Sequence, residues 1–383
     1  MPRTWTTALL ELLSIKRFWQ GQGHKIVTLP LLCSPDIILE PGVGTADMVK
    51  IEFAPLNIPL NRRFQTAAVL QWVFCFLFGA QCCFCVYVVI VLNGYWHVAA
   101  LYALWLYLDW DTPQAGGRRS DWVRHWTVWK HFGDYFPIHL IKTCDLDPER
   151  NYLMGFHPHG ILVAGAFGNF CTEYTGFREL YPGMTPYLHT LGIWFSFPFF
   201  REYLMSSGVV SCSKKSLTHV LSQKGGGNVS IIVIGGAAES LEARPGSLVL
   251  EALNRKGFVK IALRCGAHLV PVFSFGENDL FNQLKNPKGS LVRTIQECMR
   301  KTLGFSLPLF HARGVFQYSL GFMPFRQPIY TIVGEPIVVE RNVSPSSDEV
   351  DRLHGCYLGA LAKLFEQHKA EYGILENQHL IFT

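Results

Sequence analysis

The chain has 383 residues, of which 49% are hydrophobic, 14% aromatic and 16% charged, and its formal net charge is +5. This composition excludes a disordered or coiled-coil protein and is typical of a globular protein associated with membranes. The mild charge, without a sustained run of Lys and Arg interleaved with aromatic residues, argues against a nucleic-acid partner.

Residues 1–47 consist of a short Trp-containing amphipathic piece followed by coil punctuated by Pro and Gly. We expect no functional site in this N-terminal extension.

Residues 64–108 contain no Asp, Glu, Lys or Arg. Because about 20 apolar residues cross a bilayer, this run is long enough for two crossings, and the turn dipeptide Asn93-Gly94 divides it. The basic pairs Arg62-Arg63 and Arg118-Arg119 flank the run, and basic flanks stay in the cytosol. The sequence therefore predicts a transmembrane helical hairpin with a turn near 93–94 and both ends cytosolic. A single bent or re-entrant insertion is the alternative.

Four aromatic residues recur at helical spacing in residues 120–132, with basic residues elsewhere on the same helix. They are Trp122, Trp126, Trp129 and Phe132. Trp combined with Lys or Arg is typical of a helix at the membrane interface, so we favour this interpretation over a plain core helix.

The rest of the chain, residues 109–383, alternates apolar strand-like segments with helical ones. Strands are predicted at 151–156, 228–236, 267–276 and 328–339, and a helix at 254–265. Strands alternating with helices indicate an α/β cytosolic domain with a mostly parallel sheet. A capping box at 346–349 predicts a long C-terminal helix.

The tetrapeptide HPHG, His157 to Gly160, follows the first of these strands. Strand ends in α/β sheets commonly face ligands, while Pro158 restricts the backbone and Gly160 permits close approach of a substrate. A neutral His is a good general base near neutral pH, so His157 and His159 are candidate catalytic residues. A structural His pair is the alternative. Zinc would need a third ligand, which no HExxH or Cys-rich cluster supplies, so we expect no metal.

The segment GGAAES places Gly235 and Gly236 directly after the second strand and Glu239 just beyond them. The glycines again allow close backbone approach, and the acid can orient a histidine. A tight turn with a solvated or helix-capping Glu is the alternative. The motifs GxGxxG and GxSxG are absent, which favours direct transfer by a histidine over a covalent intermediate.

Lys256, Lys260 and Arg264 recur four residues apart on one helical face, next to Arg255. Such a basic stripe can bind the phosphates of a nucleotide-like carrier, and an ordinary solvated face explains the spacing equally well. The segment GIWFSFPFF (192–200) is almost wholly apolar, and it suits an acyl-chain channel, a membrane contact or core packing.

Six blocks occur in the order found in the type-2 diacylglycerol acyltransferase family, which the chain resembles from about residue 48 to its C-terminus. They are DYFPIHL, HPHG, FREYLMSSG, GGAAES, RKGFVKIALRCGAHLVPVFSFGEN and HARG. Within the family, EFAPLNIPLNRRFQTAAVLQW, GGGN and LFHARGVFQYSLG look more like the monoacylglycerol acyltransferases. The resemblance also makes residues 1–47 an upstream extension outside the catalytic unit.

The resemblance implies a multi-pass enzyme of the endoplasmic reticulum membrane, able to associate with lipid droplets, with a cytosolic domain like that of the glycerolipid acyltransferases. It implies transfer of a fatty acyl group from acyl-CoA, a co-substrate used without a further cofactor, to monoacylglycerol, making diacylglycerol. The other expected partners are membrane lipids and a homo- or hetero-oligomer with other lipid-synthesis enzymes.

Carried over residue by residue, the family's catalytic histidine lies in HPHG and its acid is Glu239. The related glycerolipid acyltransferases use HxxxxD, but Leu162 and Ala164 stand five residues after the two histidines. The family's neutral-lipid motif FLxLxxx is only partly present, because Gly79 stands where Leu is expected.

We therefore expect His159, oriented by Glu239, to take the proton of the acceptor hydroxyl as that hydroxyl attacks the thioester. His157 and backbone N–H groups would position the base or stabilise the oxyanion. The further residues that shape the expected site are Pro158, Gly160, Gly235 and Gly236. Acylation of diacylglycerol to triacylglycerol, a serine lipid hydrolase and a non-catalytic lipid-droplet protein are the alternatives.

Overall fold

The structure, a computed structural model, describes residues 51–55, 57–284, 286–287 and 289–383. The predicted N-terminal extension, residues 1–47, lies outside this described part.

Seven strands form the central sheet, in the spatial order β1-β10-β7-β2-β5-β3-β4. Their bounds are β1 Ile138–Lys142, β2 Tyr152–His157, β3 Thr185–Thr190, β4 Val209–Ser211, β5 Asn228–Val233, β7 His268–Phe275 and β10 Ile329–Val333. Every neighbouring pair is parallel except β10 and β7. The predicted α/β class with a mostly parallel sheet is therefore confirmed.

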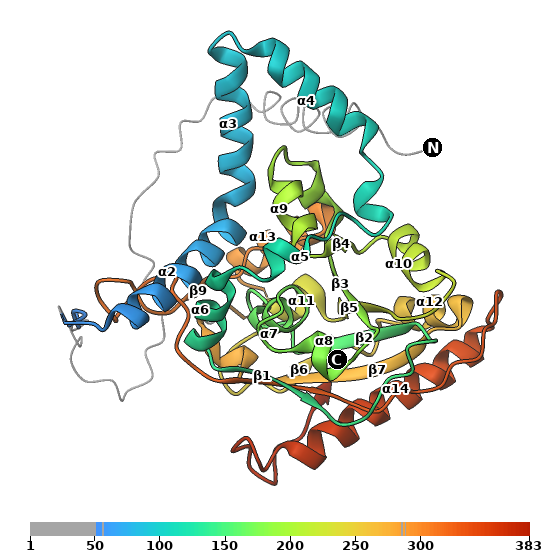
Figure 1. Cartoon of the computed structure of the whole chain (residues 1–383). Helices are drawn as coiled ribbons and strands as arrows, with labels where there is room; N and C mark the ends of the chain where they lie inside the picture. The colour runs from blue at the N-terminus through green and yellow to red at the C-terminus, as the bar shows by residue number, and fades with distance from the viewer. Residues whose placement is uncertain (1–50, 56, 285, 288) are drawn as a thin grey trace, which may run out of the picture. The chain divides into compact units, whose positions relative to one another are not determined.

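Helices cover both faces of this sheet (Figure 1). The first face packs against α2, α6 and α7, and the second against α12 and α14. The helices are α2 Leu60–Phe74, α3 Ala80–Leu92, α4 Trp96–Leu108, α5 Asp121–Arg124, α6 Thr127–Tyr135, α7 Ala164–Phe170, α8 Phe177–Leu180, α9 Phe200–Ser206, α10 Lys214–Leu221, α11 Gly236–Ser240, α12 Gly257–Cys265, α13 Leu291–Leu303 and α14 Ser347–His368. Two short ribbons complete the described part: β6 Val249–Leu250 with β11 Ile381–Phe382, and β8 Asn282–Gln283 with β9 Phe310–His311.

The C-terminal helix α14 begins where the capping box predicts. Ser346 is its N-cap, and the Ser346 hydroxyl accepts a hydrogen bond from the Glu349 amide at 3.1 Å. This contact satisfies one of the amides that have no partner in the first turn of a helix. The helix packs Tyr357 and Leu361, both fully buried, against the second face of the sheet.

The apolar run forms a long helix followed by a short one. A π-helical turn, Cys75–Gly79, joins α2 and α3 into one helix, Leu60–Leu92, which is 33 residues long and apolar enough to cross a membrane. The chain turns at Asn93-Gly94, the predicted position, into α4. At 1.5 Å per residue α4 spans about 20 Å, less than the roughly 30 Å of a hydrocarbon core. The structure therefore supplies one candidate span, and two full crossings are not shown.

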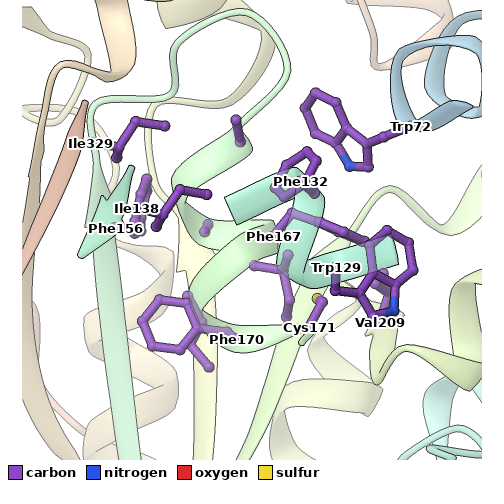
Figure 2. Close-up of a cluster of buried hydrophobic side chains, with 14 of the residues drawn as sticks. Trp72, Trp129, Phe132, Ile138, Phe156, Phe167, Phe170, Cys171, Val209 and Ile329 are labelled. Carbon is purple, nitrogen blue, oxygen red and sulfur yellow. The ribbon is translucent and has the colours of Figure 1, made fainter. Parts of the chain in front are cut away.

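The first half of this long helix belongs to the protein core. Trp72 on α2 is fully buried, with its ring centroid 5.0 Å from that of Phe132 on α6 and 5.8 Å from that of Phe167 on α7 (Figure 2). Residues 50–383 consequently form one compact unit. Within this unit α2 contributes side chains to the core, and the division into a segment 64–108 and a domain 109–383 stays a prediction.

The aromatic segment at 120–132 divides into two helices instead of one. Trp122 and Trp126 lie at α5 and the α5–α6 junction and are exposed, Trp122 by 74%, whereas Trp129 and Phe132 on α6 are buried. The core interpretation therefore holds for Trp129 and Phe132, and an interfacial position stays a prediction for Trp122 and Trp126.

Candidate active site

Three neighbouring parallel strands bring the candidate residues to one edge of the sheet. Strand β2 lies between β5 and β7 and ends at His157, so HPHG leaves the sheet at its centre. The segment after β5 carries Glu239 on α11, and the segment after β7 carries Glu277. The carboxyl ends of adjacent parallel strands are the usual location of ligand sites in open α/β sheets.

Glu239 holds the backbone of the HPHG loop. Its carboxylate is buried, with Oε1 accepting a hydrogen bond from the His159 amide at 2.6 Å and Oε2 accepting one from the Glu251 amide at 2.9 Å. Burial raises the pKa of Glu239 to about 7. The expected hydrogen bond between this acid and an imidazole is not present: each carboxylate oxygen accepts from a backbone amide instead.

His159 has the tautomer that a general base needs. Its Nδ1 lies 3.1 Å from the carbonyl oxygen of Gly160. Because a carbonyl can only accept, Nδ1 must carry the proton, and the lone pair is therefore on Nε2. Nε2 has no hydrogen-bond partner among the described residues and is not an enclosed atom. Desolvation lowers the pKa of His159 below its usual 6.5, so the ring is neutral at physiological pH.

His157 is the last residue of β2 and is fully buried. Tyr357 on α14 donates its hydroxyl proton to the carbonyl oxygen of Gly155 at 3.1 Å, and its oxygen lies 3.1 Å from His157 Nε2. The tyrosine proton is thus already engaged, so His157 Nε2 is the donor in the second contact. Burial lowers the pKa of His157 to about 3. This imidazole is therefore neutral, and its hydrogen bond with Tyr357 holds it at the start of the HPHG loop.

Glu277, in the block RKGFVKIALRCGAHLVPVFSFGEN, is a further residue of the site to which the sequence alone assigned no role. Its buried carboxylate accepts a hydrogen bond from the Gly165 amide at 2.8 Å through Oε2, while Oε1 has no partner in the described part of the chain. A Cβ atom at Gly160 would lie 2.9 Å from Glu277 Cγ. Burial raises the pKa of Glu277 to about 7. The available signal was its position, since Glu277 directly follows Gly276 at the end of a buried strand, and Glu239 likewise comes shortly after glycines at a strand end.

The glycines expected near the site have specific steric roles. A Cβ atom at Gly235 would lie 2.2 Å from Glu239 Oε2, so only glycine leaves room for the acid. Gly160 and Gly236 have φ values of +60° and +57°, which L side chains rarely adopt. The peptide bond between His157 and Pro158 is cis.

The basic stripe is mostly remote from these groups. Arg255 donates from Nη2 to the carbonyl oxygen of Gly235 at 3.4 Å and so contacts the site. Lys256 forms an exposed ion pair with Asp351, and Lys260 and Arg264 lie on the exposed face of α12. Within the described ranges, no group of three or more His, Cys, Asp or Glu side chains is placed to hold a metal ion.

The geometry supports proton transfer at His159 Nε2. Neither histidine hydrogen-bonds a Ser or Cys side chain in the described part of the chain, although such a contact is the mark of an activated nucleophile. Two buried carboxylates, Glu239 and Glu277, fix the loop around the base. The site therefore suits a base that activates a bound hydroxyl directly.

Comparison with known proteins places the chain in a family. The family model described as diacylglycerol acyltransferase matches residues 88–383. The chain is 61% identical over 334 residues to 2-acylglycerol O-acyltransferase 1 of Bos taurus, covering 87% of this chain and 100% of that protein. It is 56% identical over 333 residues to the Homo sapiens protein of the same name, covering 87% and 99%.

Two further matches are more distant. Diacylglycerol O-acyltransferase 2 of Homo sapiens is 46% identical over 322 residues, covering 84% of this chain and 83% of that protein. The crystal structure of a 1-acyl-sn-glycerophosphate acyltransferase from Thermotoga maritima superposes with a TM-score of 0.39 at 10% identity, covering 81% of this chain and 97% of that chain. On the sequence matches, the family resemblance seen in the sequence blocks is confirmed: the chain belongs to the diacylglycerol acyltransferase family.

Proposed function

We propose that the chain transfers a fatty acyl group from acyl-CoA to a free hydroxyl of monoacylglycerol, making diacylglycerol. The names of its relatives support this acceptor, since those called 2-acylglycerol O-acyltransferase 1 are 56–61% identical and diacylglycerol O-acyltransferase 2 is 46% identical. The observation that carries the chemistry is the unprotonated Nε2 of His159 at the end of the central strand.

In the proposed reaction, His159 Nε2 takes the proton of the acceptor hydroxyl while the hydroxyl oxygen attacks the thioester carbonyl. Backbone N–H groups near Gly160 stabilise the oxyanion. The ester C–O bond forms, the C–S bond breaks, and the proton passes from His159 to the departing CoA thiolate. Base catalysis of this kind typically contributes about 10²- to 10⁴-fold.

The buried acids act through the backbone in this proposal. Glu239 fixes the amide of His159 and Glu277 fixes the amide of Gly165, so the loop between them is held at both ends. His157, at the end of β2, is hydrogen-bonded to Tyr357 and so holds the start of the same loop. Arg255, which contacts Gly235, is the basic residue best placed to meet the phosphates of acyl-CoA.

We place the enzyme in the endoplasmic reticulum membrane, with the catalytic residues on the cytosolic side and with access to lipid droplets. Support comes from the 33-residue apolar helix Leu60–Leu92 and from the basic pairs at 62–63 and 118–119 on either side of the apolar run. The short helix α4 fits a bent insertion that returns to the same side.

Acylation of diacylglycerol is the second candidate, favoured by the 46% identity to diacylglycerol O-acyltransferase 2. Membranes containing the full chain are supplied with labelled oleoyl-CoA and either monoacylglycerol or diacylglycerol, and the labelled lipid is identified. Faster formation of diacylglycerol from monoacylglycerol is the expected result. Label found only in triacylglycerol would assign the second activity, and covalent labelling by a fluorophosphonate would instead indicate a serine hydrolase.

A further inference from the structure

Helix α13, Leu291–Leu303, is packed with its polar side inward. Arg293 and Gln296 are buried, whereas Leu291 and Ile295 are 76% and 52% exposed and Val292 is also exposed. At about 100° per residue these three apolar side chains share one face of the helix, and the two buried polar side chains share another. A surface helix of a water-soluble protein has the opposite arrangement.

Specific polar contacts fix this orientation. Arg293 forms an ion pair with Glu242 at 2.8 Å and a second with Glu297 at 3.1 Å. Gln296 donates to the carbonyl oxygen of Leu307 at 2.7 Å and accepts from the Asn286 amide. Turning the helix over would break the ion pair with Glu242 and both hydrogen bonds of Gln296, and it would bury the apolar side chains where these polar partners now lie. The outward direction of the apolar face is therefore built into the fold.

Exposed apolar residues also occur in the segments joined to the helix. Leu307, whose carbonyl oxygen accepts from Gln296, is exposed, and so are Leu284 and Leu309, which hydrogen-bond each other through their backbones. Exposed apolar surface beyond isolated residues marks a site of interaction with another molecule or with lipid. Among the described residues no segment covers the apolar face of α13, defined here as Leu291, Val292 and Ile295.

This region is joined by aromatic contacts to the long apolar helix. Phe305, just after α13, lies 5.9 Å from Trp194, and Trp194 lies 6.4 Å from Phe200, measured between ring centroids. Phe200 in turn packs on Gly79, where a Cβ atom would lie 2.8 Å from its ring. Gly79 is in the middle of the helix Leu60–Leu92, so packed side chains connect the C-terminal end of α13 to the candidate membrane span.

We propose that the apolar face of α13 lies in the boundary between headgroups and acyl chains of the membrane that receives Leu60–Leu92, and that lipid is its partner. An interfacial helix buries its apolar side roughly 5–10 Å into this boundary. The helix α13 is joined directly to the candidate site, because Arg293 forms an ion pair with Glu242, three residues after Glu239. Lipid contact at α13 brings the site to the membrane surface, where a lipid acceptor is dissolved, whichever acylglycerol that acceptor is.

The test places a photoreactive benzoyl-phenylalanine in the full chain, either at Ile295 or, as the matched control, at Lys301. Both positions are exposed on α13, and they lie about 120° apart around the helix. The proteins are reconstituted in vesicles of labelled phosphatidylcholine, irradiated, freed of unreacted lipid, and compared for label on the protein. Because both native side chains are exposed, benzoyl-phenylalanine fits at either position without repacking. Elution of both variants at the volume of the unmodified chain in gel filtration checks that they fold.

The expected result is several-fold more lipid adduct from position 295 than from position 301. Equal or smaller yield at 295 overturns the proposal. So does a yield at 295 dominated by protein adducts, which would assign the face to a second copy of the chain or to residues 1–50.

Discussion

The carboxylate of Glu239 accepts a hydrogen bond from the backbone amide of His159 at 2.6 Å and forms no hydrogen bond with either imidazole of the HPHG segment. The acid therefore sets where the proposed base stands, and it does not share or transfer the proton of that base. This relationship separates positioning from proton transfer, and the two can be measured apart.

Replacing Glu239 by Gln is expected to cost less activity than replacing it by Ala. Gln keeps one oxygen to accept the His159 amide, whereas Ala frees the loop, and a misplacement of about 1 Å costs about 10²-fold in rate. The measurement is kcat for both variants with oleoyl-CoA and monoacylglycerol, together with the pH profile. An unchanged acidic limb in Glu239→Gln supports positioning. If Gln proves as inactive as Ala, the charge of Glu239 itself takes part in the chemistry.

Activity is expected to persist at pH values below the usual pKa of histidine. A general base works in its unprotonated form, and desolvation lowers the pKa of His159 from 6.5. The acidic limb of kcat/KM, recorded between pH 5 and pH 8 with the protein in vesicles, should therefore have its midpoint below 6.5. A midpoint above that value would show that another group limits the reaction.

Replacing Glu277 by Gln is expected to stabilise the protein more at pH 8 than at pH 5. The folded pKa of about 7 lies above the ordinary 4.5, so this group's contribution to stability is complete below 4.5 and is lost as pH rises through 7. At about 1.36 kcal/mol per pKa unit, the free energy of unfolding falls by at most about 3 kcal/mol as Glu277 becomes charged. Gln at this position stays neutral and avoids this loss.

The measurement for Glu277→Gln is the change in Tm relative to the unmodified chain at both pH values. Glu149→Gln, at an exposed position, is the control and should show the same small change at both. A Tm change for Glu277→Gln that is the same at both pH values, or larger at pH 5, would contradict a raised pKa of the Glu277 carboxyl group.

Trp72→Ala is expected to destabilise the whole catalytic unit, even though Trp72 lies on the candidate span Leu60–Leu92. The side chain is buried against Phe132 and Phe167, and truncation of such a residue costs about 3–5 kcal/mol. Trp122→Ala removes the same side chain from an exposed position and should leave Tm unchanged in detergent. Equal Tm values for the two variants would show that α2 is not part of the core.

The sequence was sufficient to predict that HPHG and GGAAES meet. Both follow apolar runs that become adjacent parallel strands, β2 and β5, and such strands end at one edge. It was insufficient for the direction of Glu239, because the contact with the His159 amide depends on the conformations of both loops. Glu277 was missed because its role arises from a third strand, β7, whose neighbour in the sheet cannot be read from local pattern.

Two other differences have similar causes. Strands β1, β3 and β4 escaped prediction because they are short or only partly apolar; β4 has three residues. The aromatic segment was predicted as one helix on spacing alone, but Trp126 adopts non-helical backbone angles, which divides it into α5 and α6. Periodicity gives the face of a helix and cannot tell whether lipid or protein covers that face.

The most direct test of the proposed mechanism compares His159→Ala with His157→Ala for acylation of monoacylglycerol by labelled oleoyl-CoA, with rates normalised to folded protein. His159→Ala should lower kcat by about 10²- to 10⁴-fold, since it removes the base. His157→Ala should chiefly lower Tm, because it leaves a cavity beside Tyr357 and removes a buried hydrogen bond. Full activity in His159→Ala would contradict the assignment of this residue as the base.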